Sequence, residues 1–210
     1  EELGITLEKE YSTSDSLAYN VAFDPNSEVG RVRLVITPNE GDDLETTSYE
    51  ISKNDISGIR EFKNLTSNSN YSVSIDALWI NNIVYSDVYN VNRIDSTLKQ
   101  TPSLSSVTVS TNSEEIKFNV KLGKINDPDN SILSYIYEVY NADDFTLDSD
   151  ELTPVYTVSK NDKDDLVLDL NEIDELKTGV DYRLRVLLQY NDNEMIREAA
   201  SDYSANFLIK

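Results

Sequence analysis

Carboxylates are the most abundant side chains of this sequence that could bind a metal or take part in catalysis. The 210 residues include 39 Asp and Glu but no His, and the formal net charge is −21. Carboxylate oxygens are the ligands that calcium prefers, and the loop NADDFTLDSDEL (141–152) holds the best calcium candidates, Asp143, Asp144, Asp148 and Asp150. No acidic cluster has the Asp-x-Asp-x-Asp-Gly order with a distal Glu that a helix-loop-helix calcium site needs. Solvated loop charge is therefore the simpler interpretation.

Most catalytic chemistries are excluded or unsupported. Without His there is no Ser-His-Asp triad and no His-ligated zinc, and without Cys there is no disulfide, thiolate site or cysteine nucleophile. Only six glycines occur, and none lies in a phosphate-binding loop. Paired carboxylates hydrolyse glycosides, but among 39 acids some pair always looks suitable. We therefore expect a protein that is not an enzyme and has no cofactor, with calcium left open.

Aromatic side chains are the other group with a binding chemistry, since sugar rings stack on them. The chain has 13 Tyr and one Trp. Most fall on inward-facing strand positions, where core packing is the expected role. The least certain are Tyr135, Tyr137, Tyr140, Tyr190 and Trp79.

The charge also restricts the partners. Nucleic acids and anionic membranes bind basic side chains, and only 18 Lys and Arg are present, in no cluster. No run of about 18 apolar residues exists, so we expect no membrane insertion. The sequence does not begin with Met, and we interpret it as a processed protein or part of a longer one.

Period-two alternation is the main structural signal. Tyr71, Val73, Ile75 and Ala77 alternate with polar residues, as on a strand with one buried face. Turn formers such as Asp24-Pro25-Asn26 separate such segments. Long helices are not indicated, and the best helical candidate is one turn over 172–177.

The alternating segments occur twice. LTSNSNYSVSIDA (65–77) returns as LKTGVDYRLRVLL (176–188), and SYEISKND (48–55) returns as VYTVSKND (155–162). The offset between matching segments rises from 99 to 107, 111 and 115 along the chain, as loops lengthen in the second copy while strands keep register. This predicts two domains, 1–97 and 98–210. The polar boundary segment 93–102 is short, which favours a semi-rigid rod.

The repeated Leu-x5-Tyr pattern resembles the fibronectin type III signature. Tyr71 and Tyr182 match the family's corner tyrosine, and Leu65 and Leu176 match its packing partner. Ser86, Ser201 and Pro102 also match, whereas the family's second-strand tryptophan is replaced by Tyr19 and Phe118. The resemblance implies an all-β fold of two tandem seven-stranded immunoglobulin-like (fibronectin-III-like) β-sandwiches, with a generic immunoglobulin-like sandwich as the alternative. It also implies a structural corner, in which the ring packs inward and the hydroxyl bonds to backbone just upstream.

These observations predict a structural or adhesive module of a larger extracellular assembly. The Asn, Asp, Ile, Lys and Tyr usage is typical of low-GC bacteria and their phages, which suggests a virion fibre, tail or decoration protein, or a bacterial surface protein. The expected partners are proteins of that assembly, reached through strand edges or loop tips. The alternative is a glycan-binding accessory module that recognises a cell-surface glycan. We expect the 141–152 loop to be the most distinctive contact and to contribute little to stability.

Overall fold

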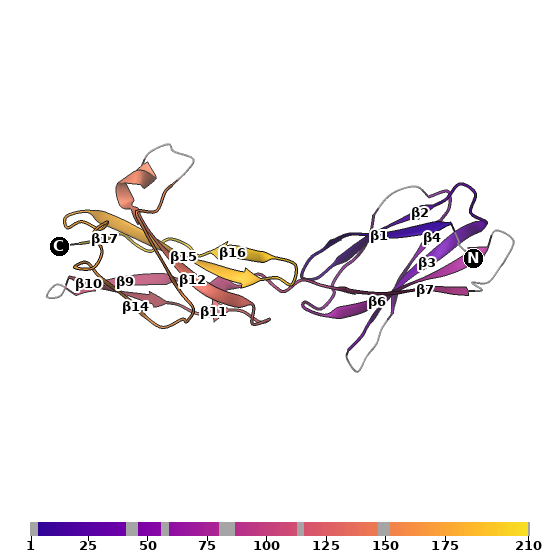
Figure 1. The fold of residues 1–210 in the computed structure, drawn as a ribbon, viewed down its shortest axis with the longest axis horizontal. Coiled ribbons are helices and arrows are strands. Elements are labelled where there is room, and N and C mark those ends of the chain that lie inside the picture. Colours follow the sequence, from indigo (N-terminus) through magenta and orange to yellow (C-terminus); the bar gives the residue numbers. More distant parts are fainter. Residues whose placement is uncertain are drawn as a thin grey trace. The chain divides into compact units, whose positions relative to one another are not determined.

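The chain forms two compact units, residues 1–99 and 100–210, in the computed structural model (Figure 1). The structure describes residues 4–40, 46–55, 59–79, 87–112, 116–146 and 152–209. The predicted boundary, between residues 97 and 98, falls two residues before this division. That each unit folds by itself stays a prediction.

Unit 1 is a sandwich of two antiparallel sheets. One sheet has the order β1-β2-β5 and the other has the order β4-β3-β6-β7. In the described residues its strands are β1 (Ile5–Ser12), β2 (Leu17–Phe23), β3 (Val29–Pro38), β4 (Thr47–Ser52), β5 (Arg60–Phe62), β6 (Asn70–Trp79) and β7 (Asp87–Ser96).

Unit 2 repeats this arrangement with interrupted strands. Its sheets have the orders β14-β10-β9 and β13-β12-β15-β16, the short β8 pairs with β11, and β17 pairs with β15 beyond the end of β16. The described elements are β8 (Ser103–Leu104), β9 (Val107–Asn112), β10 (Lys117–Leu122), β11 (Ile125–Asn126), β12 (Ile132–Asn141), the 3-10 helix η1 (Ala142–Thr146), β13 (Tyr156–Lys160), β14 (Leu166–Asp169), β15 (Asp181–Asn191), β16 (Ile196–Ala200) and β17 (Phe207–Leu208). The first, second and last of the seven strand places are each occupied by two shorter strands.

The fold class predicted from the sequence is confirmed. Each unit is an all-β sandwich with three strand places facing four. In each unit the fourth strand pairs with the third, β4 with β3 and β13 with β12, and so belongs to the four-stranded sheet. An immunoglobulin constant domain instead places its fourth strand in the other sheet. The strand order is therefore that of a fibronectin type III sandwich.

Each unit has its own core, built by the alternation seen in the sequence. In unit 1, Leu17 and Phe62 come from one sheet, and Leu34 and Ile75 come from the other. In unit 2 the corresponding cluster includes Phe118, Leu168, Tyr137 and Val186. Both sheets of each unit bury apolar surface against one another, which is the main stabilising contribution to such a domain.

Tyr19 on β2 adds a polar link between the two sheets of unit 1. Its buried ring lies in the core, and its hydroxyl on β2 donates a hydrogen bond of 2.7 Å to Asp95 on β7. Arg93 donates to the same carboxylate at 2.6 Å. Burial and this hydrogen bond raise the pKa of Tyr19.

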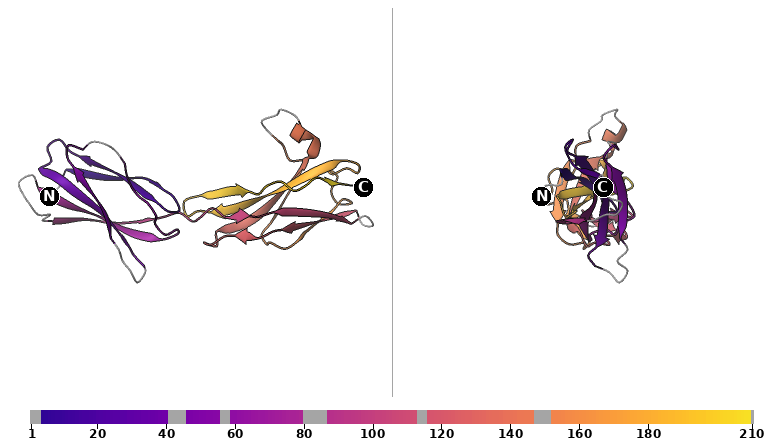
Figure 2. Two further views of the ribbon diagram at one scale, coloured as in Figure 1. Left: turned by 180° about the vertical axis from the view of Figure 1, so that it is seen from behind. Right: turned by 90° about the vertical axis from the view of Figure 1, so that its right-hand side faces the viewer.

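The predicted helical turn over 172–177 is wrong. That stretch consists of turns and irregular backbone, and Ile173 and Leu176 point into the core of unit 2. Within the described residues the one helix is η1, which follows β12 directly (Figure 2). Burial of Ile173 and Leu176, which depends on contacts with distant residues, determines the conformation of this segment and overrides local helix propensity.

Candidate functional site

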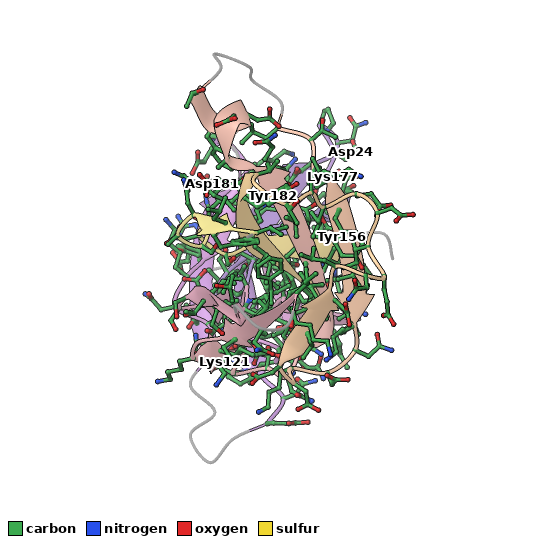
Figure 3. All side chains as sticks on the ribbon, turned by 90° about the vertical axis from the view of Figure 1, so that its left-hand side faces the viewer. Asp24, Lys121, Tyr156, Lys177, Asp181 and Tyr182 are labelled. Atoms are coloured by element: carbon green, nitrogen blue, oxygen red, sulfur yellow. The ribbon has the colours of Figure 1, made fainter. Side chains whose placement is uncertain are left out.

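The two corner tyrosines make the same local hydrogen bond in both units. Tyr71 is 4% exposed, and its hydroxyl accepts a hydrogen bond of 2.9 Å from the backbone N–H of Thr66. Tyr182 is 2% exposed, and its hydroxyl accepts one of 2.9 Å from the N–H of Lys177 (Figure 3). In both units the donor lies five residues before the tyrosine.

Each corner ties a crossover between sheets to the strand that follows it. Tyr71 enters β6 opposite Pro38, and Tyr182 enters β15 opposite Asn141. Leu176 is buried at 5% exposure in the unit 2 core, and Leu65 packs half-buried against the unit 1 core. In each unit the tyrosine hydroxyl gives a backbone N–H of the preceding loop a hydrogen-bond acceptor. How much the corner stabilises each unit stays a prediction.

The end of unit 1 is anchored by hydrogen bonds up to residue 98. Thr97 is fully buried, and its hydroxyl donates to the Thr66 carbonyl at 2.6 Å and accepts from the Ser69 N–H at 3.1 Å. The Leu98 N–H donates to Thr13, and the Leu98 carbonyl accepts from Asn68. The chain is therefore fixed to unit 1 until it leaves Leu98.

The start of unit 2 is anchored immediately afterwards. The Gln100 N–H donates a hydrogen bond of 2.7 Å to the Asp129 carboxylate, and the Thr101 and Tyr190 hydroxyls lie 3.2 Å apart. Pro102 is buried. Lys99 is thus the single residue between a backbone group bonded to unit 1 and one bonded to unit 2. We call residues 97–102 the junction.

The chain after β12 folds back onto the outer face of the four-stranded sheet of unit 2. Phe145 of η1 meets Tyr203 edge to face at a centroid distance of 4.8 Å and Tyr140 at 6.1 Å. The Arg185 guanidinium lies 5.3 Å from the centroids of both Tyr140 and Tyr203. The three rings and the guanidinium form one packed cluster, in which each aromatic and cation–π contact is favourable.

Glu138 completes this cluster. It accepts a hydrogen bond of 2.7 Å from Arg185 and one of 2.6 Å from the Tyr140 hydroxyl. Burial, followed by this hydrogen bond, raises the pKa of Tyr140. Because Phe145 packs against Tyr140 and Tyr203, the described part of this loop, residues 141–146, is packed on unit 2. How much the 141–152 loop contributes to stability stays a prediction.

The calcium candidates do not converge in the described residues. Asp143 is exposed and serves as a turn residue, with its N–H bonded to the Asn141 side chain at 3.0 Å and its carbonyl to the Thr146 hydroxyl at 2.7 Å. Asp144 is adjacent in η1, and Asp148 and Asp150 lie outside the described residues. Over the described ranges, no three Asp, Glu, His or Cys side chains are grouped as a metal site would need. Calcium binding therefore stays a prediction.

The tyrosines considered for sugar stacking are buried. Their exposed fractions are 8% for Tyr135, 0% for Tyr137 and Tyr140, and 4% for Tyr190. A ring needs an open face to stack on a sugar, so these four side chains cannot serve as platforms in this structure. The side chain of Trp79 lies outside the described residues.

Two groups in unit 2 were missed by the sequence reasoning. Asp192, 2% exposed, accepts hydrogen bonds of 2.9 Å from the N–H groups of Glu194 and Met195 and a further one from Arg197. Phe145 was also missed, although a lone aromatic residue in a polar loop is a usable signal for a packed insertion. For Asp192, the dense turn-forming sequence NDNE hid a buried carboxylate among exposed ones.

Comparisons with known proteins give a structural likeness and no family. No family model matches the chain, and no curated protein matches it. Among solved structures it is similar to a segment of two fibronectin type III domains from chicken tenascin, with 17% identity, a TM-score of 0.42 and 97% of each chain covered. No helix in the described ranges combines the length and hydropathy needed to cross a membrane.

Proposed function

We propose that this chain is a non-catalytic structural module, a tandem pair of sandwich domains that acts as a spacer in a larger extracellular assembly. The junction is the observation that supports this proposal. Hydrogen bonds hold Leu98 to unit 1 and Gln100 to unit 2, so a single residue, Lys99, lies between these two anchored positions. A spacer needs such a link, because a long flexible linker would let its domains move independently.

We place this assembly on a phage virion or a bacterial cell surface, where the module is a fibre, tail, decoration or surface-protein segment. The residue usage and the absence of Cys support this placement. Its partners are proteins of the assembly, contacted through strand edges and loop tips, with no nucleic acid and no membrane insertion. A glycan-binding role loses the support of Tyr135, Tyr137, Tyr140 and Tyr190, since all four are buried.

Distances between the units test the spacer. The chain has no Cys, so Lys63→Cys and Lys121→Cys, two exposed positions in different units, can carry a pair of spin labels. We expect a narrow distance distribution for this variant and a much broader one when Gly-Ser-Gly-Ser is inserted after Lys99. A distribution as broad before the insertion as after it would contradict the spacer function.

Attachment tests the placement separately. The protein should co-sediment with the purified phage particle or cell wall and fail to bind free oligosaccharides of that wall. Tight binding of a free oligosaccharide would instead favour the glycan-binding module.

A further inference from the structure

The two units carry an equivalent ion pair at different places on equivalent strands. In each unit the pair joins the third strand to the strand that begins with the corner tyrosine. In unit 1, Arg33 on β3 faces Asp76 on β6, with an Arg33–Asp76 contact of 2.5 Å. In unit 2, Glu138 on β12 faces Arg185 on β15 at 2.7 Å.

The corner tyrosines give a common origin for counting. Asp76 lies five residues after Tyr71 (76 − 71), whereas Arg185 lies three residues after Tyr182 (185 − 182). On the partner strands, Arg33 lies five residues before Pro38, the residue opposite Tyr71. Glu138 lies three residues before Asn141, the residue opposite Tyr182. The two ion pairs are therefore offset by two residues, which on a strand means the next position on the same face.

Exchange of strands between the units would separate every one of these charges from its partner. With the tyrosine register kept, β3 paired with β15 sets Arg33 against Leu187 and Arg185 against Val35. By the same count, β12 paired with β6 sets Asp76 against Ile136 and Glu138 against Ser74.

Asp76 carries a large penalty in such an exchange. Its side chain is only 12% exposed in the native pair. A carboxylate at this depth is costly when no cation faces it. Exchange would place the side chain of Ile136 opposite Asp76.

Neighbouring copies of one fold are prone to this error. Exchange and misassembly between similar adjacent domains are characteristic failures of repeat proteins, and specificity often depends on penalties against the wrong pairing. We propose that the offset ion pairs are a registration device, which directs β3 to β6 and β12 to β15 and disfavours exchange between units of one chain or of two copies.

The two cores also disfavour exchange between the units. By the tyrosine register, Val32 and Leu34 of unit 1 correspond to Tyr135 and Tyr137 of unit 2, which are much larger. Exchange would thus also mismatch core volumes. The test must therefore change the charges and leave the cores as they are.

Val35 and Ser74 provide a matched pair of variants. They face each other on the outer side of unit 1, both half-buried, at the position that corresponds to the Glu138–Arg185 pair. The double variant Val35→Glu/Ser74→Arg gives unit 1 a second pair that matches unit 2, so exchange would find complementary charges. The double variant Val35→Arg/Ser74→Glu has the same composition, but exchange would set like charges together.

Charge contacts within each strand stabilise native unit 1 most in the variant that we expect to exchange more, so they work against the expected result. In Val35→Glu/Ser74→Arg each new charge neighbours an opposite charge on its own strand, Arg33 or Asp76, whereas in the reversed variant it neighbours a like charge. The first variant should therefore have the more stable unit 1. Melting followed by Trp79 fluorescence, which reports on unit 1 alone because the chain has one Trp, checks this.

Refolding of the full chain measures the exchange. After dilution from denaturant at low and high protein concentration, double-jump unfolding gives the non-native fraction, and light scattering gives the dimer fraction. We expect Val35→Glu/Ser74→Arg to raise the sum of the non-native and dimer fractions at least about twofold over the parent and over the reversed variant. This factor corresponds to the free energy of a regained surface ion pair. Equal fractions in the three proteins would overturn the proposal.

A second pair of variants covers a loss of folding in unit 1. Ile136→Arg/Leu187→Asp gives unit 2 a pair at the position of the Arg33–Asp76 pair, and Ile136→Asp/Leu187→Arg is its reversed control. The first should again raise the exchanged fraction about twofold over the second. Equal exchanged fractions in these two variants would likewise overturn the proposal.

Discussion

Removing a hydroxyl from the core of unit 2 should have opposite effects at two tyrosines. Tyr182 is bonded to the Lys177 N–H at 2.9 Å, so Tyr182→Phe leaves that donor without its acceptor. The hydroxyl of Tyr137 is buried and has no hydrogen-bond partner among the described residues. Burial raises the pKa of Tyr137 to about 12, consistent with a group far from water. Tyr137→Phe therefore removes an unsatisfied polar atom and nothing else.

The magnitudes follow from these environments. Loss of one hydrogen bond costs about 1 kcal/mol, and Lys177 is exposed enough for water to replace the tyrosine, so Tyr182→Phe should destabilise unit 2 by about that amount. Burial of an unpaired hydroxyl costs about 1 to 3 kcal/mol, so Tyr137→Phe should stabilise unit 2 by about 1 kcal/mol. For a unit of this size the two variants should melt about 8 °C or more apart.

The single tryptophan makes the measurement specific. Trp79 belongs to unit 1, so its fluorescence reports on unit 1, while far-UV circular dichroism reports on both units. Both variants should shift only the circular-dichroism transition, in opposite directions. If Tyr137→Phe destabilises as much as Tyr182→Phe, the Tyr137 hydroxyl has a partner and the argument from its burial is wrong.

Three further predictions concern the units, a buried carboxylate and the packing of η1. Residues 1–99 and 100–210 expressed separately should each unfold cooperatively in calorimetry, and failure of both would reject the two-domain organisation. Burial alone would raise the pKa of Asp192, but hydrogen bonds from Met195, Arg197 and Glu194 lower it overall. Its stabilisation is thus present above the unfolded pKa of about 3.9 and is lost as the pH falls through the lower folded value. Asp192→Asn should cost about 2 kcal/mol in urea melts at pH 7 and progressively less below about pH 4, and a constant cost would contradict this. Phe145→Ala should cost about 1 to 2 kcal/mol through lost aromatic contacts, and a neutral effect in the same melts would show that η1 is not packed.

The sequence alone determined the sandwich and the positions of its corner tyrosines. Strand alternation at Tyr71, Val73 and Ile75 encodes one buried face because side chains alternate along a strand. The corner bond joins groups five residues apart, Lys177 and Tyr182, so a short pattern is enough to predict it. Both signals are local and survive in a single sequence.

The tertiary structure decided which groups meet on the outer faces of the two four-stranded sheets. Tyr140 lies on the outward side of β12, yet it is fully buried because Phe145 and Tyr203 pack over it. Arg33 and Asp76 are 43 residues apart, and only the register of β3 with β6 brings them together. Alternation gives the face of a strand on which a side chain lies, but not whether another segment covers that face. That depends on contacts between distant residues, which no local pattern in one sequence records.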